Sequence, residues 1–418
     1  MLLIQKFLLN HSFADLAALH GVEISVDRRH GHKFSLNYNQ ITSKNDDPLA
    51  CECRGLILSN GSSLKELAVM VDGRLSFDHI VPGLTKIVAH PMSRFFNHGQ
   101  GEAKIDWDDP ALQVLNKVDG TCCIVYFDHF IHEWHVATRS MPEADQPLAV
   151  GSNLTFRKLF ESGLNKTTGL TFTEFTAKLN PNKTYCFELT TPYNIVVVQH
   201  EDSAITLLAI RDKITGKEEL PENNELSQIV PTADSYSVKS VSDVIDFVNA
   251  RNPSEFEGVV LRDSKFNRIK IKSVAYTAAH RAIDCVGRSP RSCLELVLSE
   301  KADDVLPLLP KVIAAELTKM QALVYNFFQK FAQQYAEITQ ATLLDVANPQ
   351  FAEWNEKKIF AKNVNNSKIW QAPTFAIKSG KTKDLTSFIK HCQVNGSWPN
   401  PFLDNVLELA GYSREDKI

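Results

Sequence analysis

The sequence predicts an α+β fold for residues 1–286, followed by an all-α region over residues 287–418. Three observations lead to this division. Short β-like runs separated by turn residues fill the chain from about residue 24 to residue 275. The pattern changes near GRSPRS (287–292), and beyond Pro290 the apolar residues recur every three or four positions, which is typical of helices. We therefore expect two domains with a boundary near residue 286.

The composition sets limits on the function. The chain has 418 residues, enough for two domains, and its 44% hydrophobic and 22% charged content is ordinary for a folded protein. A net charge of -4 excludes attraction of nucleic acid by bulk charge, so a nucleic-acid partner would need a local basic groove. The eight cysteines form no CxxC pair, which argues against a zinc finger and favours a reducing, intracellular and cytoplasmic setting.

The N-terminal 21 residues are apolar, but Lys6, Asn10 and His11 interrupt them. No apolar run approaches the roughly 20 residues of a membrane span, so we expect neither a signal peptide nor a membrane segment. Ser12 before an apolar stretch and Gly21 after it predict a short capped helix.

Eight runs in the first domain are rich in β-branched and aromatic residues and end at turn residues, so we expect strands there. We expect helices at 153–163 and 240–251, and a surface loop at 211–228. The eight expected strands are RGLILSNG (54–61), CCIVYF (122–127), HEWHVATRS (132–140), YCFEL (185–189), YNIVVVQH (193–200), AITLLAI (204–210), EGVVLRD (257–263) and RIKIKS (268–273).

In the second domain, Pro310 is expected to open a long helix, because proline suits the first helical position and an apolar stripe follows. The stripe consists of Ile313, Leu317, Met320, Val324, Phe327 and Phe331. A shorter helix is expected through Leu385, Phe388, Ile389 and Cys392, and another from Pro401 to Gly411.

Lys117 opens KVDG (117–120), directly before an expected buried strand. A lysine is a nucleophile only when its amine is unprotonated, and burial and neighbouring cations lower its pKa. Lys270 and Lys272 are two residues apart on an expected strand, so their side chains share one face. We therefore expect these two lysines to lower the pKa of Lys117, and to bind a phosphate during its transfer.

Two acidic residues, Glu188 and Glu257, stand among β-prone residues. Taken singly, each is expected on the exposed face of a half-buried strand, because acidic residues are rarely buried without a partner. The ordered series of KVDG, Glu188, Glu257-Gly and Lys-x-Lys instead favours a single site.

These residues resemble the motifs of the covalent nucleotidyltransferases, and within them the phage-type ATP-dependent RNA ligase 1 family. The matching stretches are KVDG, TRS (138–140), YCFEL, EGVVL and IKIKS, with FSLNYN, ECRGLIL and HPMSRFFN upstream and FELTTPYNIVVVQHEDSAITLLAIRDKITGKE over residues 187–218. The resemblance covers roughly residues 30 to 285 in the family's order. It implies a nucleotidyltransferase domain of antiparallel sheets with helices, similar to ATP-grasp ligases, and an enzyme that joins RNA ends through lysyl-AMP and RNA-adenylate in RNA repair.

The resemblance also implies a role for each matching residue. Lys117 would attack the α-phosphate of ATP and become AMP-linked. The nucleotide would be bound by Arg54, Arg94, Arg139, Glu188, Lys270 and Lys272.

Three positions depart from the family pattern. Arg94 and Arg139 replace lysines that are common in the family, which keeps the charge but changes its geometry. Leu36 stands where the family has a tyrosine, so we expect no nucleotide contact from it.

A divalent ion, Mg²⁺ or Mn²⁺, is expected because ATP carries more negative charge than one lysine can approach unaided. Asp119 and Glu257 are the expected carboxylates, in direct contact or through water. The resemblance also suggests Asp303, in KADDV, as a metal ligand, although acidic residues are common in the first turn of a helix.

Two other motifs are set aside. HFIHEWHV holds His129, His132 and His135, but a strand would place the last two on opposite faces, so we expect solvent-exposed histidines and no zinc. KSGKT (378–382) lacks the first glycine of a phosphate-binding loop, since that position is Phe375, and we expect no kinase there.

Two alternatives to an RNA ligase remain open. One is another covalent nucleotidyltransferase, an mRNA guanylyltransferase or a DNA ligase, but these usually continue into a β-barrel. The other is a non-catalytic RNA-binding protein. The expected partners are RNA 5′-phosphate and 3′-hydroxyl ends, with cleaved tRNA as one source, and we expect a monomer with no membrane partner.

Overall fold

The computed structural model describes every residue except 40–41, 72–73, 149–152, 195, 239, 289, 299–301, 368–369, 395–405 and 407–418. The chain divides into two compact units, Met1–Tyr276 and Thr277–Ile418. Helix α7 (Val274–Arg288) begins at the end of the first unit, so the expected boundary at residue 286 falls within this helix.

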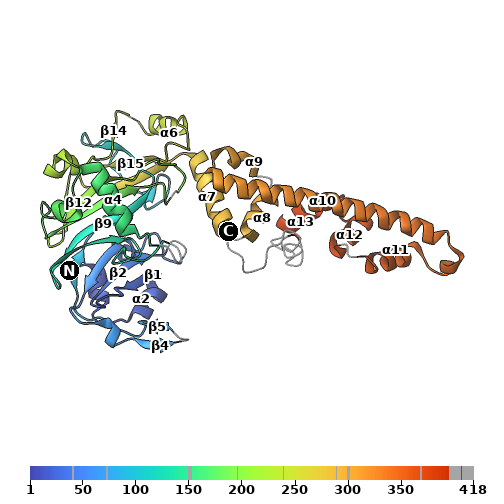
Figure 1. Cartoon of the computed structure of the whole chain (residues 1–418), viewed down its shortest axis with the longest axis horizontal. Helices are drawn as coiled ribbons and strands as arrows, with labels where there is room; N and C mark the ends of the chain where they lie inside the picture. Colours follow the sequence, from blue (N-terminus) through green and yellow to red (C-terminus); the bar gives the residue numbers. More distant parts are fainter. Residues whose placement is uncertain are drawn as a thin grey trace. The chain divides into compact units, whose positions relative to one another are not determined.

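The first unit contains three larger sheets and a small hairpin, as Figure 1 shows. Neighbouring strands are antiparallel except for β16 and β7, so the predicted antiparallel α+β fold is confirmed. The first sheet has the order β1 (Val22–Val26), β2 (Lys33–Tyr38), β3 (Arg54–Ser59), β6 (Lys86–Ala89). The second has the order β10 (Glu133–Thr138), β9 (Thr121–Asp128), β11 (Lys183–Thr190), β12 (Ala204–Asp212), β13 (Glu218–Glu219). The third has the order β14 (Ser235–Tyr236), β8 (Gln113–Asn116), β15 (Gly258–Arg262), β16 (Arg268–Lys272), β7 (Phe96–Asn97). The hairpin consists of β4 (Val69–Val71) and β5 (Arg74–Ser76).

Short helices connect and cover these sheets. The expected N-terminal helix is confirmed: the Ser12 side chain accepts from the Asp15 N–H at its start, and left-handed Gly21 ends it. The helices are α1 (Leu3–Phe7), α2 (Phe13–His20), α3 (Pro48–Glu52), α4 (Phe156–Thr168), α5 (Phe172–Thr176) and α6 (Val241–Asn249). Single 3-10 turns lie at Leu64–Glu66, Pro221–Asn223 and Glu225–Gln228.

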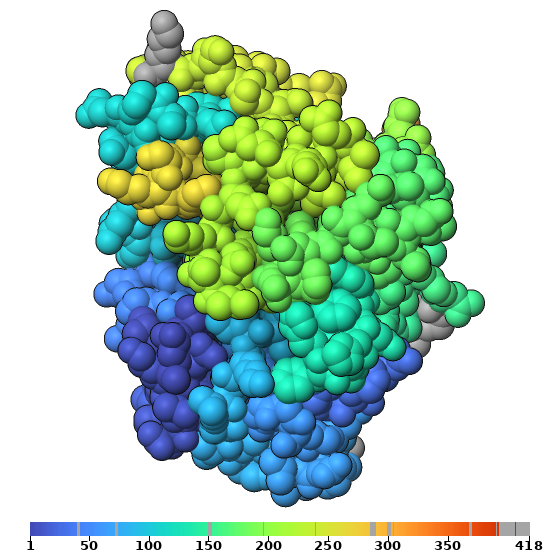
Figure 2. Space-filling view, turned by 90° about the vertical axis from the view of Figure 1, so that its left-hand side faces the viewer, coloured from blue at the N-terminus to red at the C-terminus, as the bar shows by residue number. Residues whose placement is uncertain are grey.

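Apolar side chains join the sheets to one another and to these helices. Ile57 and Ala89 of the first sheet pack against Ile124, Tyr126 and Ala137 of the second. The other face of the second sheet is covered by α4, through residues such as Phe160 and Leu164. Figure 2 shows part of the third sheet from outside, where yellow atoms near residue 270 adjoin cyan atoms near residue 100, in agreement with the pairing of β16 and β7.

Seven of the eight expected strands are present, but the strand expected at YNIVVVQH (193–200) was wrong. The described residues of this segment form turns and bends. The physical reason is a contact with a distant residue. The backbone N–H groups of Val197 and Val198 donate to the carboxylate of Asp119, so they are not available to a neighbouring strand.

Every element described in the second unit is a helix. The long helix expected after Pro310 and the helix expected through Leu385 are confirmed, whereas the helix expected from Pro401 to Gly411 lies outside the described residues apart from Val406. The elements after α7 are α8 (Pro290–Leu298), α9 (Ala302–Val305), a 3-10 turn (Leu306–Leu308), α10 (Lys311–Val346), a 3-10 turn (Pro349–Phe351), α11 (Glu356–Asn365), α12 (Gln371–Lys378) and α13 (Leu385–Val394). Among the helices that the structure describes, none combines the length and the apolar character needed to cross a bilayer.

Candidate functional site around Lys117

The segment that carries Lys117 connects the third sheet to the second. Strand β8 ends at Asn116, and the backbone N–H of Lys117 then donates to the carbonyl oxygen of Gly258 at 3.0 Å. KVDG and EGVVL, which are 140 residues apart, therefore lie side by side. Strand β9 begins at Thr121, four residues after Lys117, and lies between β10 and β11 in the second sheet.

Gly120 is required where this segment passes β11. A Cβ atom at position 120 would lie 2.3 Å from the carbonyl oxygen of Leu189 and 3.3 Å from Cγ of Glu188. Any larger side chain would push the segment away from β11. The glycine of KVDG thus brings Lys117 close to Glu188.

A buried carboxylate holds two of the predicted lysines. Oε2 of Glu257 lies 2.7 Å from Nζ of Lys117, and Oε1 of the same side chain lies 2.8 Å from Nζ of Lys272. Glu257 is only 3% exposed. It is therefore not on an exposed strand face, the alternative that its sequence context left open.

The pKa of Lys117 is raised, which reverses the expectation from the sequence. Burial opposes the ammonium form, but the charges of Glu257, Glu188 and Asp119 outweigh burial. In this state Lys117 is a protonated partner of Glu257. The expectation was wrong because the carboxylate of Glu257, 140 residues away in the sequence, lies in contact with Lys117 and favours its ammonium form.

Lys270 is the cation whose proton is held weakly. Burial, and then the charges of Lys272, Lys117 and Arg54, lower its pKa to about 7. Its Nζ lies 5.7 Å from the centre of the Phe95 ring, and the guanidinium of Arg54 lies 5.2 Å from the same ring. A bound anion would restore the proton on Lys270, since opposite charge favours the charged form.

Glu188 faces this cluster from β11. It pairs with Cys122 across the sheet, while its neighbours Phe187 and Leu189 point into the opposite apolar core. Burial raises the pKa of Glu188 to about 7, and the charge of Lys117 opposes that rise. Glu188 is 9% exposed, so it too is not on a solvated face.

Arg54 offers an unused donor. Within the described part of the chain, its Nη1 atom is buried and has no hydrogen-bond partner. The backbone of Arg139 lies beside the next residue, since a Cβ on Gly55 would be 3.0 Å from Cα of Arg139. A cation with a buried spare donor is suited to an anionic ligand.

Asp119 makes contacts that the sequence did not predict. One carboxylate oxygen accepts from the N–H groups of Val197 and Val198 at 3.0 and 2.8 Å, and the other accepts from the hydroxyl of Tyr276 at 2.7 Å. These contacts place Asp119 as an anchor for the segment that carries Lys117. Tyr276 and the 197–198 backbone were missed, because neither belongs to a recognised motif, and only the four-residue distance from Lys272 to Tyr276 pointed to the tyrosine.

The remaining predicted residues lie apart from this cluster or are held by other groups. The guanidinium of Arg94 packs 4.1 Å from the centre of the Tyr38 ring, and its Nη2 donates to Asn45 at 2.6 Å. Leu36 is fully buried in the N-terminal core, in agreement with the expectation that it makes no nucleotide contact. Asp303 belongs to the second unit, where it is exposed and accepts from Gln321 at 2.7 Å.

The interpretation of the three histidines needs a correction. His129 and His132 are exposed, as expected, but His135 is only 2% exposed. Its side chain points inward from β10 and lies 3.2 Å from the carboxylate of Glu143. The sequence alone cannot distinguish a buried histidine from an exposed one, because burial depends on an acidic partner, here Glu143, that is identified only in the structure.

Comparison with known proteins extends the picture. The family model of phage-type RNA ligases, described as RNA ligase, matches residues 52–276, more than half of the chain. A protein of Autographa californica nuclear polyhedrosis virus, which carries the name bifunctional polynucleotide kinase/RNA ligase, is 27% identical over 74% of this chain. An immediate-early protein ICP-46 homolog of Invertebrate iridescent virus 3 is 24% identical over 44% of it. The matches span 42% and 39% of these two relatives, so the chain corresponds to less than half of either.

Among solved structures, an archaeal ATP-dependent RNA ligase is similar at 14% identity over 77% of this chain and 78% of its own. Its TM-score of 0.41 is too low to support any further conclusion.

Proposed function

The chain belongs to the phage-type RNA ligase family, and on that premise we propose that it is an ATP-dependent RNA ligase that joins an RNA 3′-hydroxyl to a 5′-phosphate. The observation that carries this proposal is the contact between Lys117 and buried Glu257 at 2.7 Å, beside the cations Lys270, Lys272 and Arg54. A lysine held in place by a buried carboxylate, next to donors for phosphate, suits a covalent attack on a nucleotide.

In the first step, Nζ of Lys117 attacks the α-phosphorus of ATP. An N–P bond forms, the bond from that phosphorus to the bridging oxygen breaks, and pyrophosphate leaves with the electron pair. The ammonium must lose one proton before it attacks and a second as the N–P bond forms. Oε2 of Glu257, at 2.7 Å, is placed to pass these protons on to water or to the departing pyrophosphate. The product is a lysyl-AMP phosphoramidate.

In the next two steps, AMP moves from Lys117 to RNA and is then released. An oxygen of the RNA 5′-phosphate attacks the lysyl-AMP phosphorus, and the proton returns to the lysine amine. The RNA 3′-hydroxyl then attacks the activated 5′-phosphate, forms the phosphodiester and displaces AMP. Both steps develop charge on phosphate oxygens, which Lys270, Lys272 and Arg54 would stabilise.

The other residues position the nucleotide. Glu188, which pairs with Cys122 of β9, would accept from the ribose hydroxyls. Arg139 lies beside the Arg54–Gly55 backbone and would contact sugar and phosphate, while Arg94 would face the departing phosphates. Asp119 would act through Tyr276 and the 197–198 backbone by fixing the segment of Lys117.

A divalent ion, Mg²⁺ or Mn²⁺, would neutralise charge on the ATP phosphates. Both oxygens of Glu257 contact lysine ammonium groups, and both oxygens of Asp119 accept from protein donors, so each carboxylate would meet this ion through an intervening water. Asp303 is proposed as a metal ligand only because of the family resemblance.

We propose broken RNA, such as a cleaved tRNA, as the substrate, and a monomeric enzyme inside the cell. The reason for preferring a ligase to a guanylyltransferase or a DNA ligase is the second unit. Those enzymes usually continue into a β-barrel, whereas every element described after residue 276 is a helix.

A labelling experiment tests the proposal. The protein is incubated with α-labelled ATP or GTP and Mg²⁺ and then denatured, and the label that remains on the chain is measured. We expect label from ATP only, its loss in Lys117→Ala, and its retention in Lys104→Ala, which changes an exposed lysine. Lys117→Ala should still seal RNA that already carries a 5′-adenylate. Label from GTP alone would indicate a guanylyltransferase, and AMP attached to Lys117→Ala would refute the assignment.

A further inference from the structure

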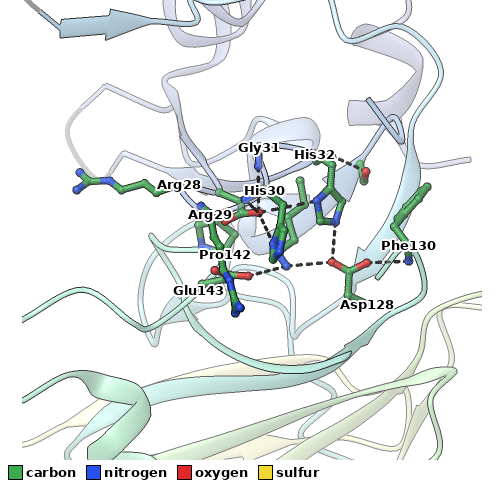
Figure 3. Close-up of polar contacts among 12 residues, drawn as sticks. Arg28, Arg29, His30, Gly31, His32, Asp128, Phe130, Pro142 and Glu143 are labelled. Atoms are coloured by element: carbon green, nitrogen blue, oxygen red, sulfur yellow. Dashed lines mark hydrogen bonds and ion pairs between the residues drawn. The ribbon is translucent and has the colours of Figure 1, made fainter. Parts of the chain in front are cut away.

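The turn between β1 and β2 brings three possible metal ligands together. Residues 27–33 read DRRHGHK, and Gly31 takes a left-handed φ of 76° between the two histidines. One side-chain atom each of Asp27, His30 and His32 lies within 4.8 Å of the other two. Figure 3 shows His30, Gly31 and His32 on this turn, next to Asp128 and Glu143.

The distances are close to those of a tetrahedral site. Nδ1 of His30 and Nδ1 of His32 lie 3.6 and 3.9 Å from the same oxygen of Asp27. Two ligands of a tetrahedral zinc ion are about 3.3 Å apart when each metal bond is about 2.0 Å long. Both distances to Asp27 are a few tenths of an ångström longer than this, and the side chain of His30, 33% exposed, has room to move closer. The same Asp27 oxygen accepts from the backbone N–H groups of His30 and Gly31 at 3.0 and 3.2 Å, so a bound ion would replace at least one of these hydrogen bonds.

The ring of His32 is oriented as in metal-binding histidines. Its Nε2 lies 2.8 Å from Oδ2 of buried Asp128. The same oxygen of Asp128 also accepts from Nζ of Lys33 at 2.9 Å. Nε2 is therefore the ring nitrogen that donates to Asp128, and Nδ1 is the one that faces Asp27. A histidine held by a carboxylate in this way is the usual outer support of a metal site.

Two further observations favour a cation here. Nδ1 of His30 is buried and, among the described residues, has no hydrogen-bond partner. The cluster also has an excess of negative charge, because Asp27, Asp128 and Glu143 are accompanied by a single buried ammonium, that of Lys33. Unpaired buried charge is costly, so a bound cation would stabilise this cluster.

We propose that Asp27, His30 and His32 bind one zinc ion, with water as the fourth ligand. Two imidazoles and a carboxylate suit zinc, whereas the ion that accompanies ATP prefers oxygen ligands. The outer support comes from Asp128, the last residue of β9, so the ion would link the β1–β2 turn to the second sheet. Its role would be structural, and it is independent of the proposed ligase activity.

The test uses full-length protein freed of metal by a chelator, without ATP or RNA. Zn²⁺ alone is added, and the bound zinc is counted by mass spectrometry; Co²⁺ alone reports tetrahedral coordination by its visible absorption. We expect about one ion per chain and a rise in melting temperature with zinc concentration. His30→Ala should bind zinc at least tenfold more weakly, and a large excess of Mg²⁺ should not displace zinc.

The matched control is His20→Ala, which removes another histidine–aspartate pair of the same unit, that of His20 with Asp47 at 2.6 Å. It should bind zinc like the unchanged protein. If His30→Ala does not fold, as judged by circular dichroism, His30→Gln replaces it. Zinc binding that is equal in the His30 variant and in the unchanged protein, or absent from both, would overturn the proposal.

Discussion

At the scale of single residues, the site depends on how buried charges are compensated. Glu257 lies between Lys117 and Lys272 and is ionised there, because the two ammonium groups outweigh burial and lower its pKa. Glu188 makes no such contact with the residues that the structure describes, and burial raises its pKa to about 7. Two glutamates of the same site therefore differ in protonation near neutral pH.

The raised pKa of Glu188 predicts a pH dependence of stability. An unfolded glutamate ionises near pH 4.3. Between that pH and about 7 the folded protein holds a proton that the unfolded chain has released, so the folded state loses stability as pH rises through this range. Glu188→Gln cannot ionise and avoids this loss. From pH 5 to pH 8, its free energy of unfolding should improve relative to the unchanged protein by up to about 3 kcal/mol.

Urea denaturation at the two pH values measures this difference. Glu133→Gln, which changes an exposed glutamate on β10, is the control and should show no such change. An equal pH dependence for Glu188→Gln and the unchanged protein would show that Glu188 is ionised throughout.

Tyr276 provides a second prediction at this scale. Its hydroxyl donates to Asp119 at 2.7 Å, so Tyr276→Phe should loosen the segment of Lys117 and slow AMP attachment by about tenfold to a hundredfold, with little change in ATP affinity. Single-turnover labelling at several ATP concentrations separates the two effects. Tyr185→Phe is the matched control, because its hydroxyl accepts from Asn180 at 2.9 Å in another core. Equal labelling rates in the two variants would leave Tyr276 without a positioning role.

At the scale of secondary-structure elements, strand β16 determines which lysines reach the site. Ile269 and Ile271 are buried in the core of the third sheet, and the alternation of the strand places Lys270 and Lys272 on the other face. One face of a single strand thus supplies a lysine that pairs with Glu257 and another with a pKa of about 7.

Substitution on this strand should therefore have a strong effect. Lys270→Ala and Lys272→Ala should each reduce AMP attachment by about a hundredfold to a thousandfold, the usual cost of a lost donor to a developing anion. Lys265→Ala, an exposed lysine in the turn before β16, should react at the normal rate. The measurement is the initial rate of labelling at saturating ATP. Near-normal rates in both strand variants would remove β16 from the proposed chemistry.

At the scale of the whole molecule, the residues of the Lys117 cluster lie in the first unit, while the second unit is formed by helices in its described part. Within the second unit, α10 buries Leu317, Met320 and Val324 and packs against α8 and α11. The stripe predicted from the sequence therefore has partners in its own unit, and we propose that the second unit serves RNA rather than ATP.

Truncation tests this division of labour. The chain cut after Arg288 keeps α7 complete and should still form lysyl-AMP, but it should discriminate poorly between RNA substrates. The measurement compares AMP labelling, and sealing of a nicked stem-loop against a plain single strand, for full-length and truncated protein. An unchanged preference would assign the second unit a purely structural role, and loss of labelling with a normal circular dichroism spectrum would place part of the chemistry beyond residue 288.

The sequence alone determined the features that depend on neighbours in the chain. The caps of α2 at Ser12 and Gly21, the alternation of β16 and the apolar stripe of α10 follow from local hydrogen bonds and from the periods of strand and helix. The motif series, read as a family resemblance, brought Lys117, Glu257 and Lys272 to attention, and the structure places the three in contact.

The tertiary structure alone decided the protonation states and the supporting contacts. The pKa of Lys117 is raised, not lowered as the sequence suggested, because the carboxylate of Glu257, 140 residues away in the sequence, contacts its ammonium group. The 197–198 backbone bends away from a β-strand because Asp119 accepts its N–H groups, and His135 is buried against Glu143. Electrostatic energy and desolvation depend on distances in space, and no local sequence pattern contains those distances.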